Sequence, residues 1–208
     1  MKIKNAFLFS FLFLYHCSYS QTTSVKIGTQ EWATANLNVT TFRNGDTIPE
    51  AESKEEWEKA SNEGKPAWCY YNGKASNGKK YGKLYNGYAV TDVRSLAPAG
   101  WHLAPVYEWI TLINFLGGEN AAGYKMKNIS GWEDNGNGDN HSHFSALPGG
   151  FRLNDGTYDE VGKSGYFWPF DLENNMTSMV YNLYSSGSGI IHIKYHKGCG
   201  FSCRCMKD

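Results

Sequence analysis

The clearest pattern of apolar and polar positions lies in residues 100–118. Pro105 suits the first turn of a helix, and Gly117 with Gly118 supplies a stop. Between them, apolar residues recur at the three- and four-residue spacing of one helical face. They are Trp109, Leu112, Ile113 and Leu116. The pattern predicts one main helix after Gly-Trp-His-Leu, with Trp101 buried beneath it.

The segments before this helix are mixed. Residues 53–62 are charged and predict an exposed helix held by Trp57. Residues 67–72 form a compact aromatic run that predicts a strand, and 76–80 read as a loop. Residues 84–93 fit a helix or a strand, and the spacing at their beginning is weakly helical.

Strands and turns dominate after residue 144. Asn154-Asp-Gly between two β-rich runs predicts a hairpin. Further strands are expected at residues 165–168, 179–185, 190–195 and 200–206. Helices early and strands late predict the α+β class. Because no repeat or low-complexity linker interrupts the pattern, we expect one domain over residues 21–208.

Residues 1–20 are predicted to be a secretory signal. Lys2 and Lys4 precede an apolar run over residues 6–15, and Ser18 and Ser20 are the small residues expected at a cleavage site. The run is too short to span a membrane. We therefore expect cleavage after Ser20 and a secreted, outer-surface or periplasmic protein without a membrane span.

A lipoprotein anchored through Cys17 is the alternative. His16 argues against it, because a lipoprotein peptidase needs a small residue immediately before the cysteine.

Charge and cysteine content indicate which partners and which covalent cross-links to expect. Removal of Lys2 and Lys4 leaves 18 basic residues of the original 20, against 20 acidic ones. No basic patch stands out, so nucleic acid is not expected as a partner. An even number of cysteines in an exported chain suggests two disulfides. A bond between Cys203 and Cys205 would be strained, because they lie two residues apart in one expected strand, so a bond from Cys69 to the C-terminal strand is favoured. The candidates are Cys69, Cys199, Cys203 and Cys205.

Eight ordered motifs run through residues 25–208. They are Trp32-x3-Asn36-Leu37, Asn44-Gly45-x2-Ile48-Pro49, Cys69-Tyr-Tyr-Asn72, Tyr81-Gly-x-Leu-Tyr-Asn86, Gly100-Trp-His-Leu103 with Glu108-Trp109, Ala146-Leu-Pro-Gly-Gly-Phe-Arg152, Gly165-Tyr-Phe-Trp168 and Gly200-Phe-Ser-x-Arg-Cys205. In this order they resemble the Fibrobacter succinogenes major paralogous domain, a bacterial exported module.

The resemblance implies a C-type-lectin-like fold, related to the formylglycine-generating group, with the main helix packed on twisted antiparallel strands and long loops. The family has no established enzymatic activity, so it supplies no catalytic residues. The chain departs from the family at Ala97, where a cysteine is usual, which removes an expected disulfide partner for Cys205. It also departs at 168–171, where Trp-Pro-Phe-Asp replaces Trp-Ser-Ser-Thr, so any site built there is altered.

Metal and cofactor chemistry has little support in the sequence. His141 and His143 lie near Asp134 and Asp139, and alternate residues of a strand share a face. A solvated polar loop explains the run better, because a metal site needs three or four convergent ligands. Calcium stays open, although the spaced acids and closing Glu of an EF-hand are missing. We therefore expect no metal and no cofactor.

No hydrolase motif appears. Carboxylates are plentiful in the late loops, but only their separation in space could assign an acid and a base. They are Asp155, Asp159, Glu160, Asp171 and Glu173. Enzymatic activity is left open, with the balance against it.

Aromatic residues are the better clue to a ligand. Most are expected in the core, yet some could form an exposed platform with Asn and Asp, a composition that suits sugars. We predict a shallow site around the polar loop at 134–143. Its residues are Trp132, Asp134, Asp139, His141, Tyr158, Tyr166, Trp168 and Asp171.

The sequence thus favours an exported, non-catalytic binding or adhesion module whose ligand is a glycan or a cell-surface protein. A structural or interaction protein of the cell surface is the second hypothesis, and a remote enzyme of the formylglycine-generating type is the third.

Overall fold

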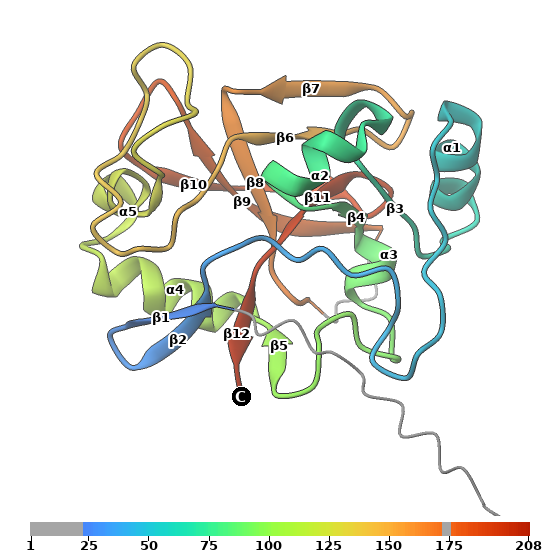
Figure 1. The fold of residues 1–208 in the computed structure, drawn as a ribbon, viewed down its shortest axis with the longest axis horizontal. Coiled ribbons are helices and arrows are strands. Elements are labelled where there is room, and N and C mark those ends of the chain that lie inside the picture. The colour runs from blue at the N-terminus through green and yellow to red at the C-terminus, as the bar shows by residue number, and fades with distance from the viewer. Residues whose placement is uncertain (1–22, 172–175) are drawn as a thin grey trace, which may run out of the picture.

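The computed structural model describes residues 23–171 and 176–208 (Figure 1). Two β-sheets and several helices make up this part of the chain, which confirms the α+β class. The predicted signal at residues 1–20 lies outside the described residues. Within the described ranges, no helix has the length and apolar character that a bilayer span requires.

The smaller sheet has the strand order β1-β2-β12-β5 and gathers both ends of the domain. Its strands are β1 (Ser24–Ile27), β2 (Gln30–Ala33), β5 (Trp101–Leu103) and β12 (Cys205–Lys207). All its pairings are antiparallel. The C-terminal strand therefore lies between the N-terminal hairpin and the strand that precedes the main helix.

The larger sheet has the order β10-β9-β8-β6-β11-β4-β3, and β7 pairs with β6 off this path. Its strands are β3 (Trp68–Cys69), β4 (Leu84–Asn86), β6 (Gly149–Arg152), β7 (Tyr158–Val161), β8 (Ser164–Trp168), β9 (Thr177–Tyr184), β10 (Ile190–His196) and β11 (Gly200–Cys203). The antiparallel pair β6–β7 around Asn154-Asp-Gly confirms the predicted hairpin.

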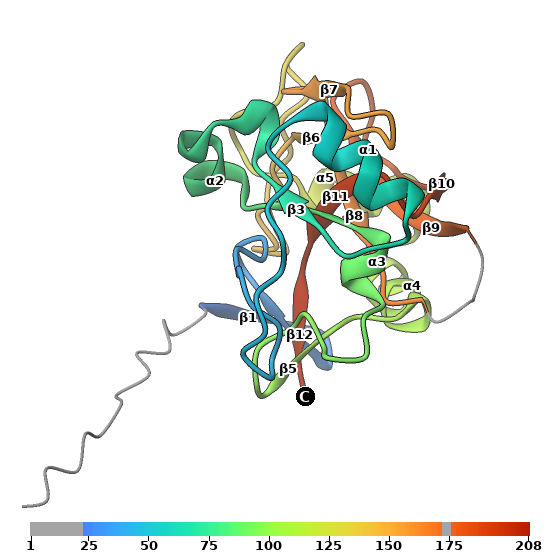
Figure 2. The same cartoon turned by 90° about the vertical axis from the view of Figure 1, so that its right-hand side faces the viewer.

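A buried arginine joins the two sheets. Residues 200–206 are not one strand as predicted: β11 ends at Cys203 and β12 begins at Cys205 in the other sheet (Figure 2). Arg204 lies between them, 1% exposed. Its guanidinium donates to the carbonyl of Ala33 (2.9 Å), to Asn36 Oδ1 (2.6 Å) and to the carbonyl of Phe144. The change of sheet thus places one cation where it satisfies acceptors from three segments.

Helix α4 (Val106–Phe115) is the predicted main helix. Its four predicted core residues, Trp109, Leu112, Ile113 and Leu116, are all at most 4% exposed. Trp109 packs against Trp32 of β2, Phe144, Phe167 of β8 and Tyr181 of β9. The helix therefore closes one core between the two sheets. Trp101 is only half-buried, so its predicted burial is partial.

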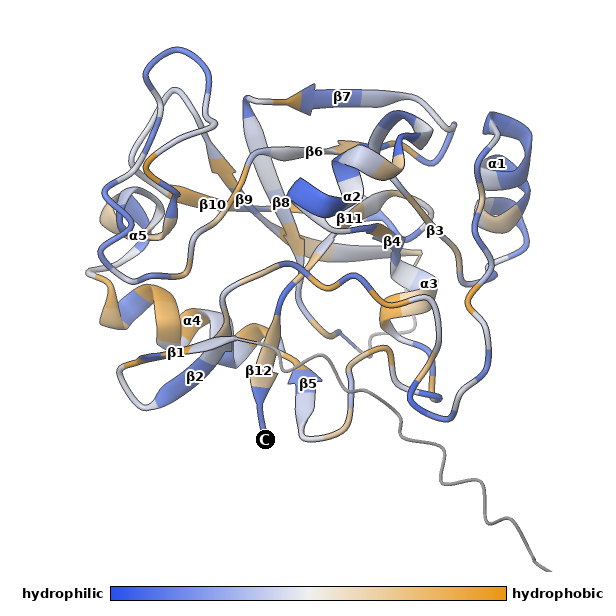
Figure 3. Cartoon of the chain, in the orientation of Figure 1, coloured by the Kyte–Doolittle hydropathy of each residue, from blue (hydrophilic) through white to orange (hydrophobic). Residues whose placement is uncertain are grey.

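Helix α1 (Lys54–Asn62) confirms the predicted charged helix. Ser53 and Glu56 form a capping box at its start, and Trp57 is 1% exposed. Figure 3 shows α1 as largely hydrophilic, in contrast with the apolar residues of α4.

Two predictions around the smaller helices were wrong, and one helix was not predicted. Residues 76–80 are helical, within α2 (Ala75–Tyr81), where Gly78 packs so closely on Tyr70 that a Cβ would lie 2.1 Å from the ring. The aromatic strand is only β3, and Asn72 then adopts a positive φ of 53° in a 3-10 turn (η1, Tyr71–Gly73). A further helix, α5 (Glu119–Met126), follows α4 without having been predicted.

The ambiguous segment at 84–93 contains both structures. It begins as β4 and turns into the short helix α3 (Gly87–Val90). The side chain of Asn86 caps α3 by accepting the N–H of Ala89 at 2.9 Å, so one residue ends the strand and starts the helix.

The expected disulfides are absent from the described residues. All four candidate cysteines are free and buried. Cys69 lies on β3, and β4 separates this strand from β11 and Cys203. Cys69 packs in a different apolar cluster from Cys203 and Cys205, so the favoured bond to the C-terminal strand was wrong.

Buried cations provide cross-links between loops. Arg152 donates to the carbonyls of Ala51 (2.7 Å) and Ser53 (2.8 Å). Lys127 donates to the carbonyls of Tyr184 (3.0 Å) and Gly187 (2.8 Å). Each of these side chains thus joins two backbone carbonyls of another segment by hydrogen bonds.

Candidate functional site

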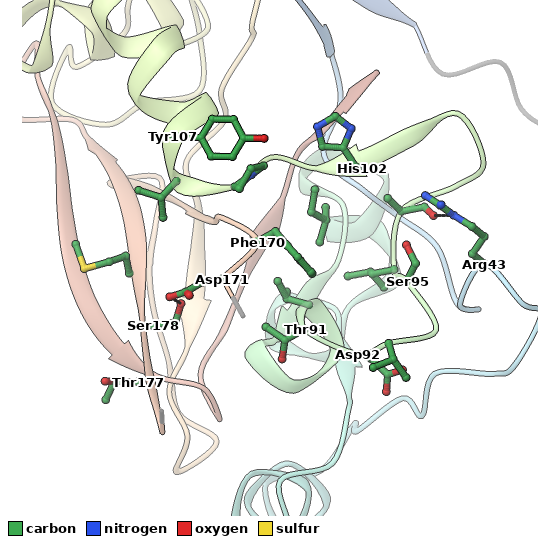
Figure 4. A pocket seen from close by; sticks show the side chains of 18 of the residues that line it. Arg43, Thr91, Asp92, Ser95, His102, Tyr107, Phe170, Asp171, Thr177 and Ser178 are labelled. Atoms are coloured by element: carbon green, nitrogen blue, oxygen red, sulfur yellow. Dashed lines mark hydrogen bonds between the residues drawn. The ribbon is translucent and has the colours of Figure 1, made fainter. Parts of the chain in front are cut away.

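A pocket of about 1010 Å³ opens between the start of α4, the segment 90–97 and the beginning of β9. Three sets of residues line it: Val90, Thr91, Asp92, Val93, Ser95, Leu96 and Ala97 from that segment; His102, Leu103, Pro105, Val106, Tyr107 and Ile110 around α4; and Phe170, Asp171, Thr177, Ser178, Met179 and Lys194 beside the large sheet, with Arg43 at the rim. Figure 4 shows Phe170 between the Asp171–Ser178 pair and the opposite wall with Thr91 and Ser95.

Most of the lining is apolar, and part of it is left open to solvent. Val93 is 99% exposed, Tyr107 67% and Ile110 48%. The latter two project from the side of α4 away from the buried stripe of Trp109, Leu112 and Ile113. Helix α4 is therefore apolar on two sides: one side fills the core and the other lines the pocket.

Polar groups stand at defined points of the pocket. Ser178 donates its hydroxyl proton to Asp171 Oδ2 at 2.9 Å. Lys194 comes from β10, opposite Met179 in the β9–β10 pair. The pocket thus combines an apolar interior with one carboxylate–hydroxyl pair and one ammonium group.

His102 is held between two carboxylates at the pocket wall. Its Nε2 lies 2.8 Å from Glu108 Oε2, and its Nδ1 lies 2.8 Å from Asp208 Oδ1. Burial favours the neutral ring, but the hydrogen bonds to Glu108 and Asp208 outweigh it and raise the pKa of His102. Both ring nitrogens are occupied, so the residue ties β5 to α4 and to the last residue of the chain.

Arg43 fixes the rim. Its guanidinium donates to the carbonyls of Ala97 (3.0 Å), Pro98 (3.1 Å) and Trp101. Three carbonyls on one side chain hold the segment that leads into β5. The wall opposite α4 is therefore braced by hydrogen bonds rather than by regular secondary structure.

A second hollow of about 180 Å³ continues along α4. It shares Val106, Ile110 and Met179 with the larger pocket. At its far end His192 of β10 lies 3.3 Å from Glu119 of α5. We call the two hollows together the α4 groove.

The predicted ligand platform does not form. Trp132, Tyr166 and Trp168 are 5%, 4% and 1% exposed, so these rings are core residues and their predicted role in stacking was wrong. The reason is topological: β8 lies inside the large sheet, and all five of its residues are buried. Tyr158 is half-buried, and the Arg152 guanidinium lies 4.6 Å from its ring.

The polar loop at 134–143 lies apart from the α4 groove. Asp134, Asp139 and His141 are exposed and line neither hollow. Asp139 accepts the backbone N–H of His141 at 3.0 Å, so this carboxylate forms a hydrogen bond within the loop. In the part of the chain that the structure describes, no three His, Cys, Asp or Glu side chains gather as a metal site. Ligand binding by this loop stays a prediction.

Of the eight predicted site residues, Asp171 alone lines the pocket. The other late-loop carboxylates do not converge there: Asp155 and Asp159 are exposed on the β6–β7 hairpin, and Glu160 accepts the Tyr166 hydroxyl at 2.8 Å. Glu173 lies outside the described residues.

Sequence reasoning missed Val93, Tyr107 and Ile110. A signal was present, because Tyr107 and Ile110 are three residues apart on the predicted helix and off its buried stripe. A helix that is apolar on two sides buries one side in the core and leaves the other available for a further contact.

Comparison with known proteins identifies a family but no individual relative. No curated protein and no solved structure matches the chain. The model of the Fibrobacter succinogenes major domain matches residues 25–207, which is most of the chain and includes both sheets and the α4 groove. The chain therefore belongs to the Fibrobacter succinogenes major domain family.

Proposed function

We propose that this chain is an exported, non-catalytic binding module of the cell surface, and that the α4 groove recognises an apolar segment of another surface protein. The observation that carries the proposal is the groove itself. Its larger hollow, about 1010 Å³, has the size of a ligand site and is lined by apolar side chains that the fold leaves in water.

Apolar exposure of this kind favours a ligand that removes it from water. Each Å² of apolar surface buried on binding contributes roughly 25 cal/mol before the costs of association. Val93, Tyr107 and Ile110 are the side chains with most surface to lose. Asp171 and Lys194 at the margin would fix the orientation of the bound segment through its polar groups.

The polar groups of the groove support binding rather than catalysis. A general base needs a free ring nitrogen or carboxylate near the reacting proton, and His102 has both nitrogens engaged at 2.8 Å. Ser178 donates to Asp171, and neither hollow includes a cysteine. Burial also raises the pKa of Cys69 and Cys199 to about 11, which disfavours the thiolate that a formylglycine-type reaction would use.

A glycan is the competing ligand. Sugars bind to exposed rings flanked by hydrogen-bonding groups, and Tyr107 with the Asp171–Ser178 pair supplies part of that chemistry. The aliphatic character of the remaining lining favours a protein segment. In the C-type-lectin-like arrangement that the family resemblance implies, loops on a rigid frame would carry this specificity.

The test uses the chain without residues 1–20, presented to a random peptide library and to a glycan array. We expect enrichment of peptides with aliphatic or aromatic residues. Ile110→Asp places a charge in the groove and should weaken the selected peptides by roughly tenfold or more.

Phe115→Asp is the matched control, because Phe115 is 63% exposed on the same helix yet lines neither hollow. It should bind as well as the unchanged chain. Glycan binding without peptide binding, or equal effects of both substitutions, would refute a peptide-binding groove.

A further inference from the structure

The large sheet ends at β10, and this strand has a neighbour on one side only. All seven residues of β10 pair with β9. Helix α5 reaches the chain just before the strand, where the N–H of Tyr124 donates to the carbonyl of Ser188 at 2.7 Å. Glu119 of α5 also lies 3.3 Å from His192. Among the described residues, β9 is the only strand that pairs with β10.

The register shows which main-chain groups face outward. Lys197 N–H donates to the carbonyl of Met176 at 2.8 Å, one position past the paired strands. Hydrogen-bonding positions alternate along an antiparallel pair, so Tyr195 and Ile193 turn their N–H and C=O groups toward β9. His192 and Lys194 turn theirs away from it. Among the described residues, none forms a hydrogen bond with these outward groups.

The side chains around this edge are accessible, and the charged groups among them are Lys194 and the Glu119 carboxylate beside His192. Ile191 is 42% exposed and Ile193 37%, on one face of the sheet, while His192 and Lys194 are exposed on the other. Strands β9 and β10 together contain a lysine and two histidines but no carboxylate. An edge with free backbone groups, isoleucines and a cation offers pairing, apolar contact and charge to an added strand.

We propose that the free edge of β10, defined by the outward main-chain groups of His192 and Lys194, binds an extended acidic segment of a partner protein as an additional strand. The outward main-chain groups lie at the edge of the sheet, whereas the side chains of His192 and Lys194 line the α4 groove. Backbone hydrogen bonds would supply affinity, and a carboxylate of the partner beside Lys194 would supply selectivity.

Charge selects an acidic partner over a second copy of this chain. Outward residues must pair with outward residues, so a symmetric antiparallel pair of two β10 strands sets Lys194 opposite Ile190, a histidine or the other Lys194. None of these side chains is a carboxylate, and like charges directly opposite each other destabilise a strand pair. An edge lysine is also a common guard against self-association of sheets.

Amide hydrogen exchange followed by NMR tests the proposal on the chain without residues 1–20. In the free protein, the amides of His192 and Lys194 should exchange fast, and those of Ile191 and Ile193 slowly. The probe is a seven-residue peptide that alternates valine with glutamate, and the control peptide has lysine in place of glutamate. The acidic peptide should protect His192 and Lys194 on the order of tenfold or more, and the control peptide should not.

Three variants separate the contributions. Lys194→Pro removes an outward N–H without breaking a bond to β9, so it should abolish the protection of His192 while the Ile193 amide still reports an intact sheet. Lys194→Gln should weaken binding by no more than about fivefold, because an exposed ion pair contributes little. Phe115→Asp, on helix α4 but outside both hollows, should leave this binding unchanged.

Three results would overturn the proposal. They are equal protection by both peptides, no protection by the acidic peptide, and protection of His192 and Lys194 that grows with protein concentration in the absence of peptide. The last result would identify a second copy of the chain as the occupant.

Discussion

Two buried tryptophans should differ in how strongly the same substitution affects stability. Trp109 on α4 is 0% exposed and Trp168 on β8 is 1% exposed. Trp168 Nε1 donates to the carbonyl of Tyr85 at 2.9 Å. Trp109 Nε1 is buried without a hydrogen-bond partner among the described residues. Phenylalanine keeps a ring at either position but removes the N–H.

The two costs follow from packing and hydrogen bonding. Tryptophan is larger than phenylalanine by about 40 Å³, which at roughly 24 cal/mol per Å³ costs ~1 kcal/mol at either site. At Trp168 the change also removes a buried hydrogen bond, which adds ~1–3 kcal/mol. At Trp109 it removes an unpaired buried donor, which offsets the packing loss by a similar amount. We expect Trp168→Phe to destabilise by ~2–4 kcal/mol and Trp109→Phe to change stability by less than ~1 kcal/mol.

Urea unfolding followed by far-UV circular dichroism measures both. The slope m must stay constant, so that the shift of the midpoint reports stability alone. Both rings keep aromatic neighbours in the variants, Tyr181 at 4.8 Å from Trp109 and Phe201 at 4.9 Å from Trp168, so stacking does not separate them. Equal destabilisation by the two substitutions would refute the hydrogen-bond argument.

Three further predictions concern the core and the clamp at His102. Trp109→Ala should cost roughly 3–5 kcal/mol in urea unfolding, because it empties the core between the sheets; a variant with unchanged stability would show that the residue is not structural. The pKa of His102 is raised in the folded state, so its contribution is fully present below the unfolded value of about 6.5 and is lost as pH rises through the folded pKa. His102→Gln should flatten that part of the stability–pH curve, and an unchanged curve would contradict the clamp. The four buried cysteines, Cys69, Cys199, Cys203 and Cys205, should all react with iodoacetamide after unfolding without reductant and none in the native protein; mass spectrometry showing a disulfide would contradict this.

Local patterns were sufficient for the elements that carry their own periodicity or caps. Helix α4 was predictable because its apolar spacing, its proline entry and its glycine stop agree. The charged helix at α1 followed from its charged residues around Trp57, and the Asn154-Asp-Gly hairpin followed from turn chemistry. The motifs also identified the family, since they span most of the chain. The C-type-lectin-like assignment and export remain predictions.

Long-range packing decided what local patterns could not. In helix α2, Gly78 packs against Tyr70, and where residues 200–206 divide between two sheets, Arg204 donates to acceptors from three distant segments. The cysteines lie on strands separated in the sheet order, so their even number did not predict bonds.

The sequence by itself determined the α+β class, the main helix, the hairpin and the family, because these rest on periodicity, turn chemistry and ordered motifs within short windows. Only the tertiary structure decided which side chains meet solvent. Tyr166 and Trp168 became core because β8 lies inside the sheet, whereas Val93, Tyr107 and Ile110 stayed exposed because no described element packs over them. Exposure depends on what lies across from a residue in space, and the spacing of neighbours along the chain does not contain that information.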